Sequence, residues 1–148
     1  MKDSVGFLIS DVSRLLRRRF DERARAIGVT RPQWRALLAL TREEGLQQGV
    51  LAEMLEVEPI TLCRMVDRLE EAGLVERRRD PGDRRAWNLY LTAKARPLIE
   101  RLRVIADEVA ATALVEVSEQ AVDQFTATLG RIRSNLSAAP GREEVVHG

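Results

Sequence analysis

Apolar residues recur every three or four positions through the first 27 residues, which is the spacing of one helical face. Val5, Leu8, Val12 and Leu15 mark that face, and arginines occupy the others. The same spacing, bounded by glycine or proline, predicts further helices over about 30–45, 49–55 and 59–72. At the start of the first of these three, the segment 30–33 (Thr-Arg-Pro-Gln) matches a capping box.

The period changes from helical to alternating at Leu74. Residues 74–79 and 87–91 read as two short strands, and the segment 80–83 (Asp-Pro-Gly-Asp) between them is a strong turn signal. An isolated hairpin of this size is unstable, so we expect it to pack on the helices.

Two longer helices are predicted after the hairpin, one after Thr92 as N-cap and one after Ser118. Both carry a narrow apolar seam, which is typical of helices that pack lengthwise on other helices. The seams comprise Ala95, Leu98, Leu102, Ile105 and Val109, and then Val122, Phe125, Leu129, Ile132 and Leu136. The pattern is lost over 137–148, where we expect a disordered tail.

This order of elements predicts a mainly α fold with a small β-hairpin wing. Residues 29–92 would form a winged helix-turn-helix DNA-binding lobe. The flanking segments 1–28 and 93–136 carry more apolar surface than one chain covers, which predicts a helical dimerisation region and a homodimer.

Charge is unevenly distributed along the chain, although the net charge is only +1. Residues 1–40 hold nine basic and four acidic side chains, whereas 98–148 hold five basic and eight acidic ones. This separation favours one face directed toward a polyanion. The single cysteine, Cys63, excludes an intramolecular disulfide, and no apolar run approaches a membrane span. We therefore expect a soluble cytoplasmic protein that does not contact membranes.

The helix over 59–72 is the expected reader of the major groove, which accepts a helix and distinguishes every base pair. With its apolar stripe inward, Thr61, Arg64 and Arg68 point outward. Arg64 can donate two hydrogen bonds to one guanine. Thr61 suits a base or a phosphate, and Arg68 suits a phosphate.

The hairpin is the second candidate DNA contact, because a narrow arginine-rich tip suits the negative potential of the minor groove. Asp83, two residues before Arg85, is expected to orient the guanidinium of that arginine. The alternative is a solvated edge that resists aggregation. The basic residues of the hairpin are Arg77, Arg78, Arg79, Arg84 and Arg85.

Several stretches together resemble the MarR family of regulators: 51–55, 61–70, 73–75, 80–85 and the pair 91–92. The resemblance implies a transcription regulator, most simply a repressor, bound as a homodimer to a pseudo-palindromic operator on double-stranded DNA. It implies that Arg85 enters the minor groove and that Arg64 contacts bases. Ile60 and Cys63 replace the serine and threonine common in the family, and either could touch a thymine methyl group.

The same resemblance implies a small aromatic effector, held between the dimerisation helices and the DNA-binding lobe. Trp34 and Arg17 could line that pocket, although a core role for Trp34 is the simpler interpretation. Cys63 could sense oxidants, but it lacks a resolving cysteine, which favours an inert thiol.

Two other functional classes remain open at this point. One is a winged helix that binds proteins and not DNA. The other, an enzyme, is disfavoured because the sequence has no glycine-rich phosphate loop, no nucleophile with a plausible base and no metal-spaced cluster. We expect no catalytic residues, no metal and no cofactor.

Overall fold

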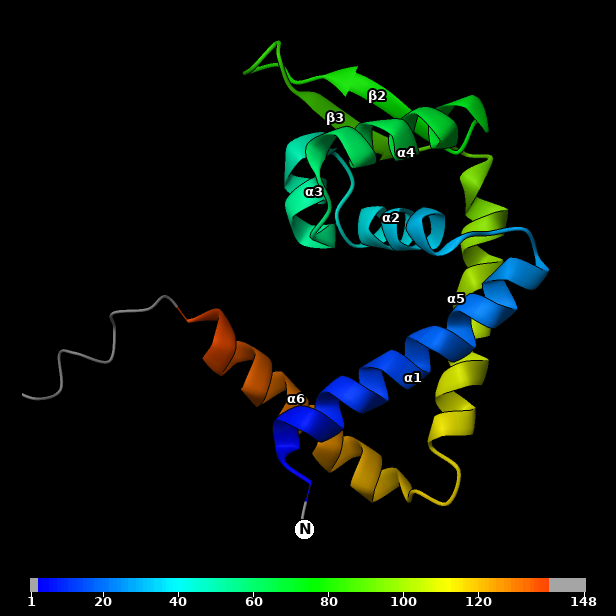
Figure 1. Ribbon diagram of the computed structural model, residues 1–148, viewed down its shortest axis with the longest axis vertical. Coiled ribbons are helices and arrows are strands. Elements are labelled where there is room, and N and C mark those ends of the chain that lie inside the picture. Colours follow the sequence, from blue (N-terminus) through cyan, green and yellow to red (C-terminus); the bar gives the residue numbers. More distant parts are fainter. Residues whose placement is uncertain (1–2, 139–148) are drawn as a thin grey trace, which may run out of the picture. The chain divides into compact units, whose positions relative to one another are not determined.

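The computed structural model describes residues 3–138. Within them the chain forms helices and short strands in an order that confirms the predicted mainly α fold with a wing (Figure 1). The elements are α1 (Val5–Ala26), α2 (Arg31–Arg42), β1 (Leu46–Gln47), α3 (Gln48–Leu55), α4 (Pro59–Glu71), β2 (Val75–Arg79), β3 (Trp87–Leu91), α5 (Ala95–Ala113) and α6 (Glu119–Ser137).

The ends of the first two helices follow directly from the local sequence. Ser4 caps α1 by accepting the backbone N–H of Phe7, and Gly28 follows the helix with φ +82°, a left-handed conformation that suits glycine. The predicted capping box of α2 is present, because Thr30 and Gln33 each accept the other's backbone N–H.

The sheet has three strands where the sequence predicted two. The two-residue strand β1 pairs with β3, which gives the antiparallel order β1-β3-β2. Leu46 of β1 and Arg77 of β2 both lie opposite Leu89 of the central strand. A strand of two residues is too short to show an alternating pattern, so only its long-range pairing reveals it.

The start of α5 also differs from the prediction. Thr92 is not its N-cap, because the helix begins at Ala95 and the Thr92 hydroxyl donates to the carbonyl of Gly73 at 2.5 Å. Gly73 ends α4 with φ +75°. Thr92 therefore joins the end of the wing to the end of α4.

One apolar core connects the helix-turn-helix to α1 and α5. Leu37, Leu51, Leu62 and Leu89 are completely buried at its centre. The second half of α1 and the middle of α5 extend this core through Phe20, Ala24, Leu102 and Ile105. The wing and α4 therefore pack against the same core.

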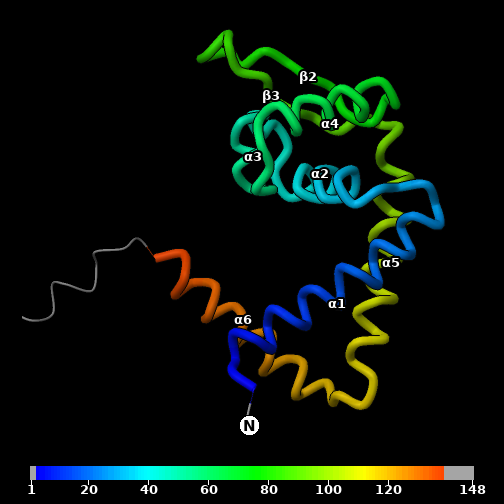
Figure 2. The backbone as a smooth tube through the Cα atoms, in the orientation of Figure 1, coloured from blue at the N-terminus to red at the C-terminus, as the bar shows by residue number. Residues whose placement is uncertain are grey.

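The chain separates into two compact units, Met1–Ala110 and Ala111–Gly148. The first holds α1 to β3 and most of α5, and the second holds α6 (Figure 2). Of the tail predicted over 137–148, Ser137 is instead the last residue of α6, and residues 139–148 lie outside the described residues. In the described part, no helix is both long and apolar enough to cross a membrane.

Candidate nucleic-acid interface

Helix α4 has one buried face and one exposed face, as its apolar stripe predicted. Leu62, Val66 and Leu69 are at most 1% exposed. Thr61, Arg64 and Arg68 are exposed, and Ile60 is 65% exposed at the second position of the helix. The predicted readers of the major groove therefore share the solvent side of α4.

The turn between α3 and α4 contains an unusual backbone conformation. Glu56 adopts φ +55°, in the left-handed region that non-glycine residues rarely occupy. The next residue, Val57, donates its N–H to the carbonyl of Ala52 at 3.0 Å. Helix α4 then begins after Glu58, whose side chain makes no capping hydrogen bond.

The tip of the wing, residues 80–86, is shaped by the carboxylate of Asp80. Its Oδ1 accepts the N–H of Gly82 at 2.8 Å and that of Asp83 at 3.0 Å. Gln47 donates to its Oδ2 at 3.2 Å. Hydrogen bonds from the Gly82 backbone and from the side chains of Gln47 and Asn88 lower the pKa of Asp80, so the ionised carboxylate holds the tip together.

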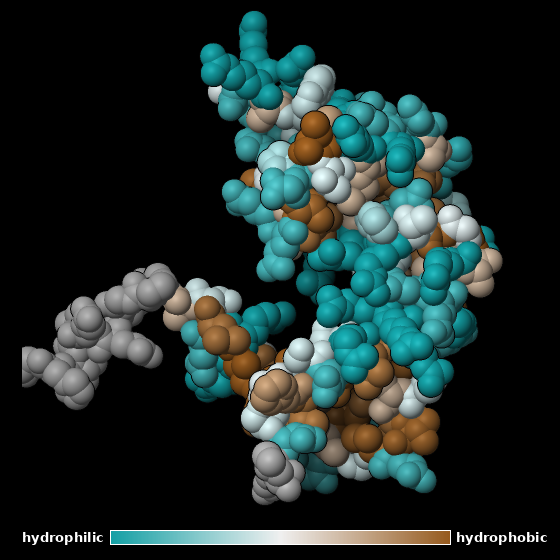
Figure 3. All heavy atoms as spheres, in the orientation of Figure 1, coloured by the Kyte–Doolittle hydropathy of each residue, from teal (hydrophilic) through white to brown (hydrophobic). Residues whose placement is uncertain are grey.

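Arg84 and Arg85 are exposed at this tip, which projects beyond the helices and is hydrophilic in Figure 3. Asp83 does not orient the Arg85 guanidinium as expected. Its carboxylate instead accepts the backbone N–H of Arg85 at 3.0 Å. This hydrogen bond fixes the backbone of Arg85 and does not hold its guanidinium.

Arg78 and Arg79 are exposed, and each stacks on an aromatic ring of β3. The Arg78 guanidinium lies 4.1 Å from the Tyr90 ring centre, and that of Arg79 lies 4.0 Å from Trp87. Arg78 also pairs with Glu76 at 3.3 Å. Arg79 donates to the carbonyl of Arg84 at 2.7 Å, which ties β2 to the tip.

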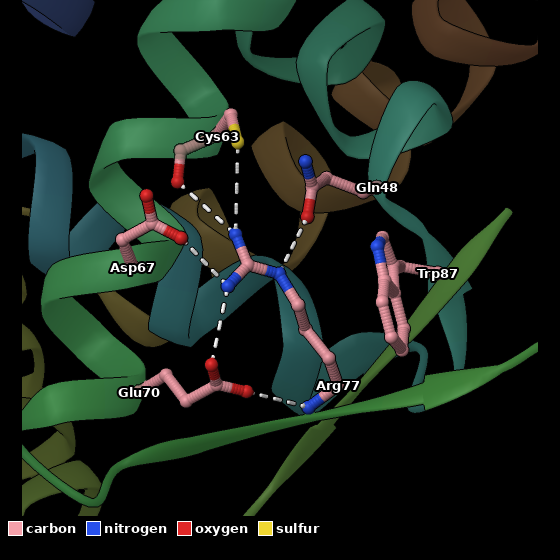
Figure 4. A pocket seen from close by; sticks show the side chains of 6 residues that line it. All are labelled: Gln48, Cys63, Asp67, Glu70, Arg77 and Trp87. Atoms are coloured by element: carbon pink, nitrogen blue, oxygen red, sulfur yellow. Dashed lines mark hydrogen bonds and ion pairs between the residues drawn. The ribbon is translucent and has the colours of Figure 1, made fainter.

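Arg77 differs from the other wing arginines, because its side chain is only 11% exposed. Its guanidinium lies 2.7 Å from Asp67 and 3.2 Å from Glu70, both on α4 (Figure 4). It also donates to the Gln48 side chain and to the Cys63 carbonyl, each at 3.1 Å. This placement disagrees with the expectation that Arg77 contacts DNA.

The partners of Arg77 were not predicted from the sequence. Asp67 and Glu70 are three positions apart and therefore share one side of α4, which was a usable signal. Nothing in the sequence shows that this side meets β2 at Arg77, because the contact depends on the packing of the sheet against the helix.

Comparisons with known proteins agree with this geometry. A model of the MarR family matches residues 27–86. The transcriptional regulator PA3341 is 36% identical, with 90% of this chain and 98% of that one covered and a TM-score of 0.76. MarR is 25% identical over 91% of this chain and 92% of its own, with a TM-score of 0.80. A MarR regulator from Methanosarcina mazei Go1 is 27% identical over 88% and 94%, with a TM-score of 0.78.

The chain belongs to the MarR family. It therefore has the fold of a transcriptional regulator, and the family's members are regulators and not enzymes.

Trp34, one candidate for the effector pocket of this MarR-family chain, is engaged inside the protein. Its ring packs edge-on against Phe20 with centroids 4.6 Å apart, and its Nε1 donates to Asp21 at 2.7 Å. These contacts support a core role. Arg17, the other candidate, is exposed on α1, and the effector pocket itself stays a prediction.

Cys63 is half-buried on α4, beside the Arg77 guanidinium. Its sulfur lies 3.8 Å from Nη2 of Arg77, and its carbonyl accepts a hydrogen bond from the same nitrogen. This side chain therefore faces the joint between α4 and the wing more than the outer face of the helix. Contact with a thymine methyl group is left to Ile60.

Proposed function

We propose that this protein is a sequence-specific DNA-binding repressor that binds a pseudo-palindromic operator as a homodimer. The observation that carries the proposal is the exposure, on one compact unit, of Arg64 on α4 and of Arg84 and Arg85 at the wing tip. An arginine-bearing helix suits the major groove and an arginine tip suits the minor groove.

The two arginine sites have different tasks in this proposal. Arg64 donates to a guanine edge and supplies specificity, with Thr61 and Arg68 beside it on bases or phosphates. Arg85 enters the adjacent minor groove, where its charge meets the focused negative potential. Arg84 and Arg78 strengthen the attraction to the phosphates.

Dimerisation is supported by apolar residues that are exposed in the described part of the chain. Val5, Leu8, Val12 and Leu15 line one side of α1, and each is at least 47% exposed. Phe125 of α6 is 54% exposed. We assign these surfaces to a second copy, whose α4 would enter the major groove one turn away, at about 34 Å.

Release from DNA would require an effector that binds the DNA-incompetent geometry more tightly than the competent one. We propose a small aromatic acid between the dimerisation helices and the DNA-binding lobe, with Arg17 as a candidate contact. An oxidant acting on Cys63 is the second candidate signal.

The test compares Arg64→Ala and Arg85→Ala across a salt series, on duplexes that the wild type selects from a randomised library. Arg64→Ala should weaken binding by about 1–3 kcal/mol per base contact and relax sequence preference. Arg85→Ala should weaken binding and reduce the salt slope by about 0.9 for each phosphate that the variant no longer neutralises.

Arg103→Ala is the control, because it removes the same charge from an exposed position on α5. Unchanged binding by both test variants would contradict the proposal. If the wild type does not bind duplex DNA at low salt, the alternative function, a winged helix that binds proteins, is favoured.

A further inference from the structure

We propose that Arg77 is a positioning residue that fastens the wing to the recognition helix α4 and supports DNA binding without touching DNA. The inference rests on the proposed function, because it explains how the two DNA-contacting elements keep their relative position. It assigns to Arg77 a task unlike that of Arg84 and Arg85, although all three lie in the same basic hairpin.

All three nitrogens of the guanidinium are occupied by protein groups (Figure 4). Nη1 pairs with Asp67 and Glu70, Nη2 donates to the Cys63 carbonyl, and Nε donates to Gln48. The backbone N–H of Arg77 also donates to the second oxygen of Glu70, at 3.2 Å. Strand β2 is therefore bound to α4 through both the main chain and the side chain of one residue.

Charge balance gives a reason for Arg77 to stay in this cluster when DNA binds. Asp67 and Glu70 have side chains 53% and 45% exposed, on the helix that would face the phosphates. If Arg77 swung out to a phosphate, two carboxylates would stay unneutralised beside a polyanion. The shielded guanidinium neutralises them best where it lies.

A chain of contacts transmits this anchoring to the tip. Two residues along β2, Arg79 stacks on Trp87 and donates to the carbonyl of Arg84. The path from α4 through Arg77 and Arg79 to the tip consists of short-range contacts. It restricts where Arg84 and Arg85 lie relative to Arg64, so less ordering is needed when both grooves are engaged.

A charge-neutral double variant, Asp67→Asn with Arg77→Gln, separates positioning from phosphate contact. The double variant removes one acid and one base, so the net charge near the DNA is kept. We expect an affinity loss of about tenfold or more, with the salt slope of the wild type. The matched control, Glu100→Gln with Arg103→Gln, removes an ion pair of α5 in the same way and should change neither quantity.

If the salt slope of DNA binding by the double variant were smaller than that of the wild type by about 0.9 per copy, Arg77 would be a phosphate contact and the proposal would be overturned. Unchanged affinity would overturn it as well. If the wild type binds duplexes with a steep salt dependence and the double variant binds them equally well, only the positioning role of Arg77 is contradicted. Wild type that does not bind duplexes contradicts the proposed function and this inference together.

A measurement on the wild type keeps the test decisive if the double variant unfolds. Nitrogen-15 NMR of the arginine side chains should show the Arg77 Nε–H exchanging slowly with water in the free protein. Its signal should stay in place when the selected duplex is added, whereas that of Arg85 should move. Fast exchange in the free protein, or a large shift of Arg77 on binding, would overturn the proposal.

Discussion

Asp21 is a buried carboxylate at the junction of α1 and α2. Arg31 donates to it through Nε at 2.6 Å, and Trp34 donates through Nε1 at 2.7 Å. Burial by itself raises the pKa of Asp21, but the two hydrogen bonds and the charge of Arg31 outweigh it. The pKa therefore lies below the ordinary 3.8, and the fold favours the ionised form.

This lowered pKa fixes the sign of an acid effect on stability. The contribution of Asp21 is fully present above the unfolded-state pKa of about 3.8 and is lost as the pH falls through the lower folded-state value. Asp21→Asn should therefore be less stable than the wild type at pH 7, and the gap should narrow in acid. Denaturant unfolding at neutral pH and near pH 3 checks this.

The control for the acid effect is Asp107→Asn, which alters an exposed aspartate of α5. Its stability should follow the wild type at both pH values. If the free energies of unfolding of Asp21→Asn and the wild type differed by the same amount at both pH values, the stabilising effect of the ionised Asp21 carboxylate would be contradicted.

Ile60 shares the exposed side of α4 with Arg64, which lies four positions later. If Ile60 packs on a thymine methyl group, replacing the contacted thymine by uracil should weaken wild-type binding by about 0.8 kcal/mol. Ile60→Ser should bind the two duplexes equally. Equal binding of both duplexes by the wild type would exclude the contact.

At the scale of elements, the α3–α4 turn holds Glu56 in a left-handed conformation at φ +55°. A non-glycine residue in this conformation destabilises the folded state by about 1–2 kcal/mol. Glycine removes this strain, but its greater freedom in the unfolded chain cancels part of the gain in stability. Glu56→Gly should therefore stabilise the protein by roughly 0.5–1 kcal/mol in denaturant unfolding.

Glu53→Gly is the matched control, since Glu53 is an exposed glutamate within α3. Glycine inside a helix costs about 1 kcal/mol, so this variant should be less stable than the wild type. Destabilisation of both variants by the same amount would contradict the interpretation of the turn.

The elements that the sequence predicted are those defined by local signals. Thr30, Gly28 and Pro59 mark helix ends through hydrogen bonds and backbone preferences within a few residues. Strand β1 and the role of Thr92 depend on partners far along the chain, so no local pattern contained them. The wing arginines look equivalent in the sequence. Their different roles become visible only in the fold, where the sheet places Arg77 against α4.

The whole molecule is expected to be a dimer, because α1 has an apolar side that is exposed in the described part of the chain. Leu8→Glu places a charge at the centre of this side and should shift the protein to monomers in sedimentation measurements. Ser10→Glu places the same charge on the opposite side of α1 and should leave the dimer intact. Dimers that persist in Leu8→Glu would show that this side of α1 is not the interface.

Two copies of the protein are proposed to read one operator together, and selection from a randomised duplex library can detect this pairing. We expect the selection to enrich two inverted half-sites whose centres lie about 10 base pairs apart. Two chains should bind each selected duplex, and Arg64→Ala should weaken this binding. Enrichment of no sequence, or of a single half-site bound by one chain, would contradict this expectation.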